Sequence, residues 1–158
     1  MLTEQASKVD LPEILKLQYQ AYQSEAKLLN SYDIPPLRQT LSDLETEMAE
    51  GLIFLKVLAP DGAVIGSVRG RIEAGTLYVG KLIVRPDMQG QGIGTKLLAE
   101  IERVCPHERC ELFTSSRSEK NIRLYQRAGY HIYKRQEVSE QLEFVYLEKS
   151  QKHGNADT

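Results

Sequence analysis

The chain has 158 residues, 41% of them hydrophobic and 27% charged, which is the size and composition of a single globular domain. Its formal net charge of −2 argues against a nucleic-acid-binding protein, which normally presents a basic face. No apolar run approaches the roughly 18 residues that span a bilayer, and the N-terminus lacks the basic and then apolar layout of a signal peptide, so we expect a cytoplasmic protein with no membrane segment.

An N-terminal strand and two helices are predicted before residue 51. The strand covers residues 2–8, and the first helix begins at Asp10, with Glu13 three residues later at the spacing of a capping box. Apolar residues at helical spacing continue this helix until the proline-containing segment 30–36 breaks it. A second set of apolar residues at helical spacing predicts another helix, which stops at Gly51.

The rest of the chain alternates between strands and helices. Three strands joined by short turns predict an antiparallel meander over residues 52–59, 63–73 and 77–84. The elements expected after it are a helix over 93–104, a strand over 111–114, a helix from Ser116 or Ser118 to a cap at Gly129, and a hairpin over 130–138 and 143–148. The strand–helix–strand passage over 77–114 implies one parallel pair.

The element order βααβββαβαββ predicts an α/β fold with a mixed, mostly antiparallel sheet flanked by helices. No linker or internal repeat divides the chain, so we expect one domain over residues 1–149. Residues 150–158 are predicted to be a polar C-terminal tail.

Neither cysteine indicates a metal or redox site. Cys105 and Cys110 have C-x4-C spacing, which fits neither a zinc knuckle nor a redox pair, and the three histidines form no HxxxH motif. We interpret the cysteines as reduced thiols and expect no metal.

A glycine-rich loop lies where the strand over 77–84 leads into the next helix. In Gln89-Gly-Gln-Gly-Ile-Gly94 the glycines let the backbone turn sharply and expose N–H groups at a helix N-terminus, which favours an anion such as a pyrophosphate. A Walker loop would need lysine before threonine, whereas Thr95 precedes Lys96, and a Rossmann fingerprint would need glycine in place of Thr95. The plain alternative is a turn that merely connects strand to helix.

A second motif, Asn121-Ile-Arg-Leu-Tyr125-Gln-Arg-Ala-Gly129-Tyr130, follows after an intervening strand. Asn121 and Tyr125 are four residues apart and share a helix face. Taken alone, Tyr125 would be a core aromatic residue and Asn121 a surface residue. Together with Gln89-x-x-Gly92-x-Gly94, the motif resembles the signatures of the GNAT acetyltransferase superfamily, and the resemblance covers residues 2–148.

This resemblance implies a GNAT-like fold in which acetyl-CoA lies where two parallel strands splay apart, here those over 77–84 and 111–114. Backbone groups of Leu82, Ile83 and Val84 would pair with the pantetheine amides like an added strand, and an N–H there would polarise the thioester carbonyl. The residues implied to hold the pyrophosphate are Gln89, Gly90, Gln91, Gly92, Ile93, Gly94 and Thr95. Asn121 would hydrogen-bond the pantetheine arm, and Tyr125 would contact the cofactor.

The implied reaction is acetyl transfer to a primary amine of a small molecule or peptide by direct attack. Tyr125 is the candidate general acid for the departing thiolate, because a phenol keeps its proton at neutral pH. Glu73 is the nearest acidic candidate for the base, although a solvated hairpin carboxylate is the simpler interpretation. Arg69, Arg71 and Glu73 alternate on one strand face, which lines the acceptor cleft or faces solvent. The competing hypothesis is a non-catalytic acyl-CoA-binding sensor or regulatory module, and GNAT relatives are often dimers, which allows a homodimer.

Acceptor choice in the GNAT superfamily lies with the first two helices and their connection, where Tyr22, Glu25 and Tyr32 are found. Tyrosines supply rigid walls and hydroxyl groups, and Glu25 would receive an ammonium group. The same residues are equally compatible with filling a seam between helix and sheet. Tyr78, on the strand over 77–84, would order water beside the acceptor.

Overall fold

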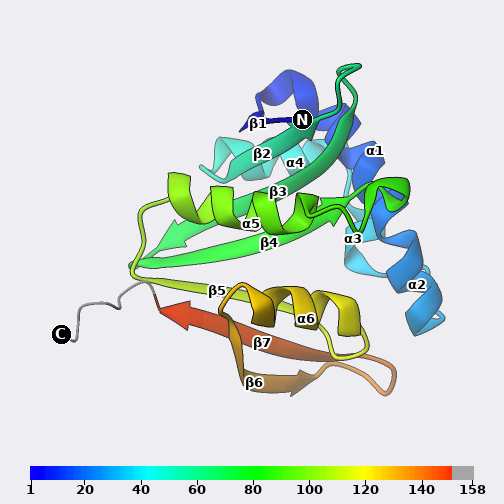
Figure 1. Cartoon of the computed structure of the whole chain (residues 1–158). Helices are drawn as coiled ribbons and strands as arrows, with labels where there is room; N and C mark the ends of the chain where they lie inside the picture. The colour runs from blue at the N-terminus through cyan, green and yellow to red at the C-terminus, as the bar shows by residue number, and fades with distance from the viewer. Residues whose placement is uncertain (151–158) are drawn as a thin grey trace.

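The computed structural model describes residues 1–150, which form a seven-stranded sheet with helices on both faces (Figure 1). The sheet order is β1-β2-β3-β4-β5-β7-β6, and β4 and β5 are the parallel pair. The strands are β1 (Leu2–Gln5), β2 (Ile53–Leu58), β3 (Val64–Glu73), β4 (Thr76–Val84), β5 (Arg109–Ser115), β6 (His131–Glu137) and β7 (Glu143–Ser150). This arrangement confirms the predicted α/β fold, the antiparallel meander and the single parallel pair.

The helices divide between the two faces of the sheet. The N-terminal ones are α1 (Leu11–Ala21), α2 (Gln23–Leu29), α3 (Pro35–Arg38) and α4 (Leu41–Ala49), preceded by a 3-10 turn η1 (Lys8–Asp10). The later ones are α5 (Ile93–Val104) and α6 (Glu119–Arg127), with a 3-10 turn η2 (Pro86–Met88) before α5. One apolar core lies under α5 and α6 and a second under α1 and α4. No helix of the described chain is long and apolar enough to cross a bilayer.

The N-terminal region differs from the prediction at three points. The first strand ends at Gln5, because Ser7 and Asp10 form a capping box around η1. The Glu13 carboxylate, which the spacing assigned to a cap at Asp10, instead accepts the backbone N–H of Val64 at 3.1 Å. The first predicted helix is divided at Tyr22 into α1 and α2. The N–H of Tyr22 still donates to the carbonyl of Gln18, and its carbonyl accepts from the N–H of Ala26, so the division is a kink.

The second predicted helix is also divided in two. Pro36 lies within the short α3, and Gln39 then adopts an extended backbone. Thr40 starts α4 with a capping box in which its hydroxyl accepts the N–H of Asp43 at 3.2 Å. At the other end of the chain β7 includes Ser150, and the rest of the predicted tail, 151–158, lies outside the described residues.

The sheet opens along the parallel pair. Pairing between β4 and β5 joins Thr76–Tyr78 to Arg109–Glu111 and goes no further along these strands. Beyond this point β4 pairs only with β3, and β5 only with β7. The two strands therefore diverge, as Figure 1 shows, and leave facing backbone edges free at the end where β4 leads into α5.

Candidate active site

A bulge in β4 shapes the opening between the strands. Ser67 of β3 pairs with Ile83 and Arg69 pairs with Gly80, so β4 contains one more residue than β3 in this stretch. Lys81, inside the bulge, has a φ of 48°, which is uncommon for a residue with a side chain. Bulges redirect side chains and end regular pairing. This one turns the end of β4 away from β5 and presents Leu82, Ile83 and Val84 on the edge of the opening.

The glycine loop lies at the open end, between β4 and α5. Gly90 and Gly92 have φ of 82° and 83°, and a Cβ built on either would meet nothing within 4 Å. Gly92 is the N-cap of α5, so the N–H groups of the first helical turn have no acceptor within the helix. Open space beside unpaired N–H groups at the start of a 12-residue helix suits a phosphate group. The loop from Gln89 to Thr95 thus combines glycines at positive φ with a helix start, and its role as a pyrophosphate loop stays a prediction.

Tyr125 lies on α6, behind the opening, with its side chain directed into the main core. It is 6% exposed, and its ring centre lies 6.3 Å from that of Tyr130. The tyrosine hydroxyls that hydrogen-bond to another described residue belong to Tyr19, Tyr130, Tyr133 and Tyr146. The Tyr125 hydroxyl has no hydrogen-bond partner among the described residues. Asn121, one helical turn earlier, is exposed.

Two residues of the first helices approach Tyr125 from the other side of the opening. The Glu25 carboxylate, on α2, accepts a hydrogen bond from the Ser118 hydroxyl at the start of α6, at 3.4 Å. Burial raises the pKa of Glu25, and burial together with the Glu25 charge raises the pKa of Tyr125. Burial, Glu25 and Tyr125 also raise the pKa of Tyr22, at the kink before α2. The Glu25–Ser118 hydrogen bond thus joins α2 to the start of α6, and the Glu25 charge acts on both tyrosines.

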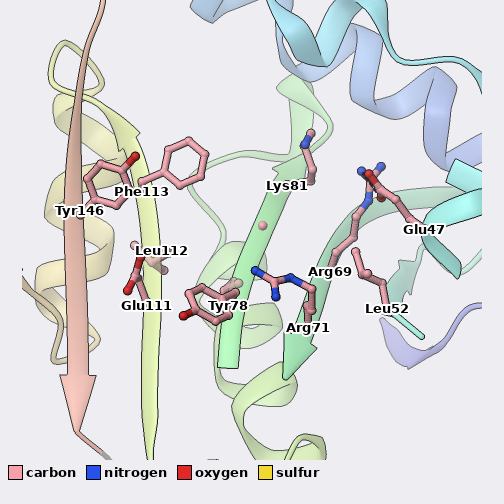
Figure 2. A pocket seen from close by; sticks show the side chains of 12 residues that line it. Glu47, Leu52, Arg69, Arg71, Tyr78, Lys81, Glu111, Leu112, Phe113 and Tyr146 are labelled. Atoms are coloured by element: carbon pink, nitrogen blue, oxygen red, sulfur yellow. Dashed lines mark hydrogen bonds and ion pairs between the residues drawn. The ribbon is translucent and has the colours of Figure 1, made fainter. Parts of the chain in front are cut away.

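A cavity of about 340 Å³ lies over the opening (Figure 2). Its walls come from β3, β4, β5 and β7, with Leu52 before β2, and the N-terminal helices contribute Glu47 of α4. Tyr78 lines it. The other residues predicted for the acceptor, Tyr22, Glu25 and Tyr32, do not line it, and Tyr32 is 58% exposed. Glu73 pairs with Arg71 at the exposed end of the β3–β4 hairpin, beyond the closed end of the parallel pair, and the structure does not bring it to the cavity.

Arg69 fixes the wall of the cavity that faces α4. It is 2% exposed and donates hydrogen bonds to Glu47 and Gln39, both at 3.1 Å, and to Gln18 of α1. Its guanidinium also lies 4.8 Å from the centre of the Phe54 ring. These contacts tie β2, β3, α1 and α4 together, so Arg69 faces the cavity but is occupied by protein partners.

Several cavity residues were not singled out from the sequence: Glu47, Lys81, Glu111, Phe113 and Tyr146. Lys81 and Phe113 belong to strands in which the alternation of apolar and polar residues does not indicate an opening in the sheet. Both cysteines, in contrast, are buried free thiols, in agreement with the interpretation of them.

Comparisons with known proteins agree with this geometry. The model of the acetyltransferase (GNAT) family matches residues 11–130, and no curated protein sequence matches the chain. The PaiA N-acetyltransferase from Thermoplasma acidophilum, in complex with coenzyme A, is 18% identical with a TM-score of 0.77, and the match covers 95% of this chain and 99% of that one. A phosphinothricin acetyltransferase from Sinorhizobium meliloti, in complex with acetyl-CoA, is 17% identical with a TM-score of 0.76 (99% and 91% covered).

A third solved structure, the ribosomal-protein-alanine N-acetyltransferase from Brucella melitensis, is 22% identical with a TM-score of 0.72 (95% and 99% covered). At these identities the likeness to solved structures establishes the fold, and the three proteins differ in the acceptors that their names give. The family match covers most of the chain, including both the glycine loop and the helix of Tyr125. The chain therefore belongs to the GNAT acetyltransferase family.

Proposed function

We propose that this enzyme transfers the acetyl group of acetyl-CoA directly to a primary amine of a small molecule or peptide, with Tyr125 as general acid. The observation that carries the proposal is the free edge of β4 beside the glycine loop at one opening; the unpartnered Tyr125 hydroxyl on α6 supports the choice of acid. Two of the similar structures contain coenzyme A or acetyl-CoA, which supports the same cosubstrate here.

The backbone of this chain offers a complete path for the cosubstrate. The free edge at Leu82, Ile83 and Val84 would take the pantetheine amides as an added strand, and an N–H at the bulge would polarise the thioester carbonyl. The first turn of α5 would hold the pyrophosphate. Asn121 is exposed one turn before Tyr125 and would bond to the pantetheine arm.

Tyr125 would stabilise the departing thiolate. The hydroxyl retains its proton at neutral pH, because burial and the nearby Glu25 carboxylate raise its pKa. The same shift makes it a weaker acid than a free phenol, so hydrogen-bond donation to the sulfur contributes alongside full proton transfer. We expect the effect on rate to lie near the lower end of the range for general acid catalysis, about 10²-fold.

Glu25 is the better candidate for the base. Glu73 is exposed, paired with Arg71 and distant from the open end of the strands. Glu25 is partly buried, its charge acts on Tyr125, and burial raises the pKa of its carboxyl, which makes the carboxylate a stronger base. It would accept a proton from the attacking ammonium directly or through one water. Glu25 was predicted to receive the ammonium group of the acceptor. As the base it would also take a proton from that group, so one carboxylate would serve both roles.

An acetyl-CoA consumption screen over a panel of amines, with mass spectrometry of the products, tests the proposal. Release of free CoA together with an acetylated amine is the expected result. Binding of acetyl-CoA without transfer to any amine would contradict the enzymatic proposal and favour a non-catalytic acyl-CoA sensor.

A further inference from the structure

We propose that Lys81 is a site of self-acetylation, at which its side-chain amine takes the acetyl group of an acetyl-CoA bound to the same molecule. This inference rests on the proposed function, because it needs acetyl-CoA in the opening between β4 and β5. Three features of Lys81 support it: its place in the bulge of β4, the direction of its side chain, and the lack of an ion pair with another described residue.

The order of the elements determines which part of the cosubstrate would reach Lys81. The glycine loop follows β4 after the short turn η2, so a pyrophosphate held in this loop lies beyond Val84. A pantetheine arm on the free edge of β4 would then run back along the strand, from Val84 to Leu82, and end at the bulge. The thioester would therefore arrive beside Lys81, the residue that lies inside the bulge.

The side chain of Lys81 points along this path. Figure 2 shows it on the wall of the cavity, directed toward the open end of β4 and away from Arg71. Its φ of 48° removes it from the regular alternation of the strand. The amine ends a flexible four-carbon stem that starts one residue before Leu82, so it can search the space in which the thioester would lie.

Lys81 differs from the other lysines that are partly buried in the described chain. Lys56 and Lys149 each hold a carboxylate at 2.8 Å, that of Asp10 and that of Glu102. An amine in such an ion pair keeps its proton and has no lone pair for attack on a carbonyl carbon. Lys81 has no ion pair with another described residue, so no carboxylate of this part of the chain holds it in the charged form.

The surroundings of Lys81 also favour the neutral amine, which is the nucleophile. An ammonium group that is taken out of water without a counter-ion is unfavourable. Burial and the charge of Arg69 lower the pKa of Lys81, with Glu47 acting in the opposite direction. A larger fraction of the Lys81 amine is therefore neutral at a given pH than for a lysine in water.

The chemical step is amine transfer with Lys81 in the place of the acceptor. Its Nζ attacks the carbonyl carbon of the thioester, the N–C bond forms as the C–S bond breaks, and the departing thiolate takes up the proton that the nitrogen loses. One lysine amine and one acetyl-CoA thus give one acetyl-lysine and one CoA thiol, with no further reactant. Because acetyl-lysine carries no charge, the opening would lose a cation beside Arg69.

Intact-mass spectrometry of the protein incubated with acetyl-CoA, without an added amine, tests the inference. The expected product carries one added acetyl group, which peptide mapping should place on Lys81. Transfer within one molecule has a rate constant that does not depend on protein concentration, saturates with acetyl-CoA and is suppressed by excess CoA. Because a bound thioester has a high effective concentration, Lys81 should react about 100-fold faster than the exposed Lys16.

Variants identify the group responsible. Lys81→Arg keeps the positive charge and removes the amine, so it should abolish the fast modification. Lys16→Arg, on the exposed face of α1, is the matched control and should be acetylated on Lys81 as fast as the wild type. Acetylation spread over the exposed lysines, a rate constant that rises with protein concentration, or an unmodified Lys81 in protein that binds acetyl-CoA by calorimetry would each overturn the inference.

The outcomes also separate this inference from the proposed function. Acetylation of free amines with Lys81 unmodified would refute self-acetylation and leave the proposed function standing. Acetylation of Lys81 without transfer to any free amine would support the modification site and refute transfer to an external acceptor.

Discussion

Replacing Tyr125 with phenylalanine should slow catalysis while leaving the fold intact. Tyr125 is 6% exposed, and its ring packs beside that of Tyr130, so Tyr125→Phe keeps the packing. The hydroxyl has no hydrogen-bond partner among the described residues, so the substitution removes no internal hydrogen bond. We expect a change in the free energy of unfolding of less than about 1 kcal/mol. General acid catalysis is worth roughly 10²–10⁴-fold, and the raised pKa of this phenol places the loss of kcat near 10²-fold, about 3 kcal/mol of barrier.

The assay is steady-state kcat at a saturating amine, measured beside the dissociation constant for CoA and a denaturant unfolding curve. A drop in kcat with unchanged CoA affinity is the predicted pattern. Full activity in Tyr125→Phe would refute the general-acid role and leave the cofactor assignment untouched. A large loss of CoA affinity would show instead that the hydroxyl mainly holds the cofactor.

Three further variants test other parts of the site. Gly92→Val places a branched side chain at a φ of 83° in the open space of the loop, so calorimetry should show CoA binding lost, and unchanged affinity would count against the pyrophosphate loop. Burial raises the pKa of Glu25, and only the deprotonated carboxylate accepts a proton, so kcat/KM should fall as the pH drops through that raised pKa. Glu25→Gln should lose this acidic limb of the pH profile together with most of the activity. An acidic limb that persists unchanged in Glu25→Gln would exclude Glu25 as the base. Arg69→Met leaves Glu47 without its buried cation, which should lower the free energy of unfolding by about 3–5 kcal/mol; a loss below about 1 kcal/mol in urea unfolding would show that the network is not structural.

The parts of the structure that local chemistry determines were predictable from the sequence. Glycine adopts positive φ without steric cost, so the sharp turns at Gly62, Gly90 and Gly92 and the end of α6 before Gly129 could be predicted from the glycines alone. The parallel pair followed from the strand–helix–strand order. The elements that changed, around Tyr22 and Gln39, lie where polar side chains bond across segments far apart in sequence, which no local pattern reports.

The cavity was harder to predict because it depends on register. Alternation along β3 correctly placed Arg69 and Arg71 on one face, but it could not tell which end of the sheet opens. Pairing of Thr76 with Arg109 puts the closed end near Glu73 and the open end near Lys81. The bulge then redirects Lys81, and a one-residue shift of this kind is invisible to a pattern of period two.

The central claim is that acetyl-CoA lies between β4 and β5, and a crystal structure of the CoA complex measures this directly. We predict pantetheine amides paired with the backbone of Leu82–Val84, the pyrophosphate on the N–H groups from Gly90 to Thr95, and the sulfur within hydrogen-bonding reach of the Tyr125 hydroxyl. CoA bound elsewhere on the molecule, with the β4–β5 opening filled by protein side chains, would contradict the account.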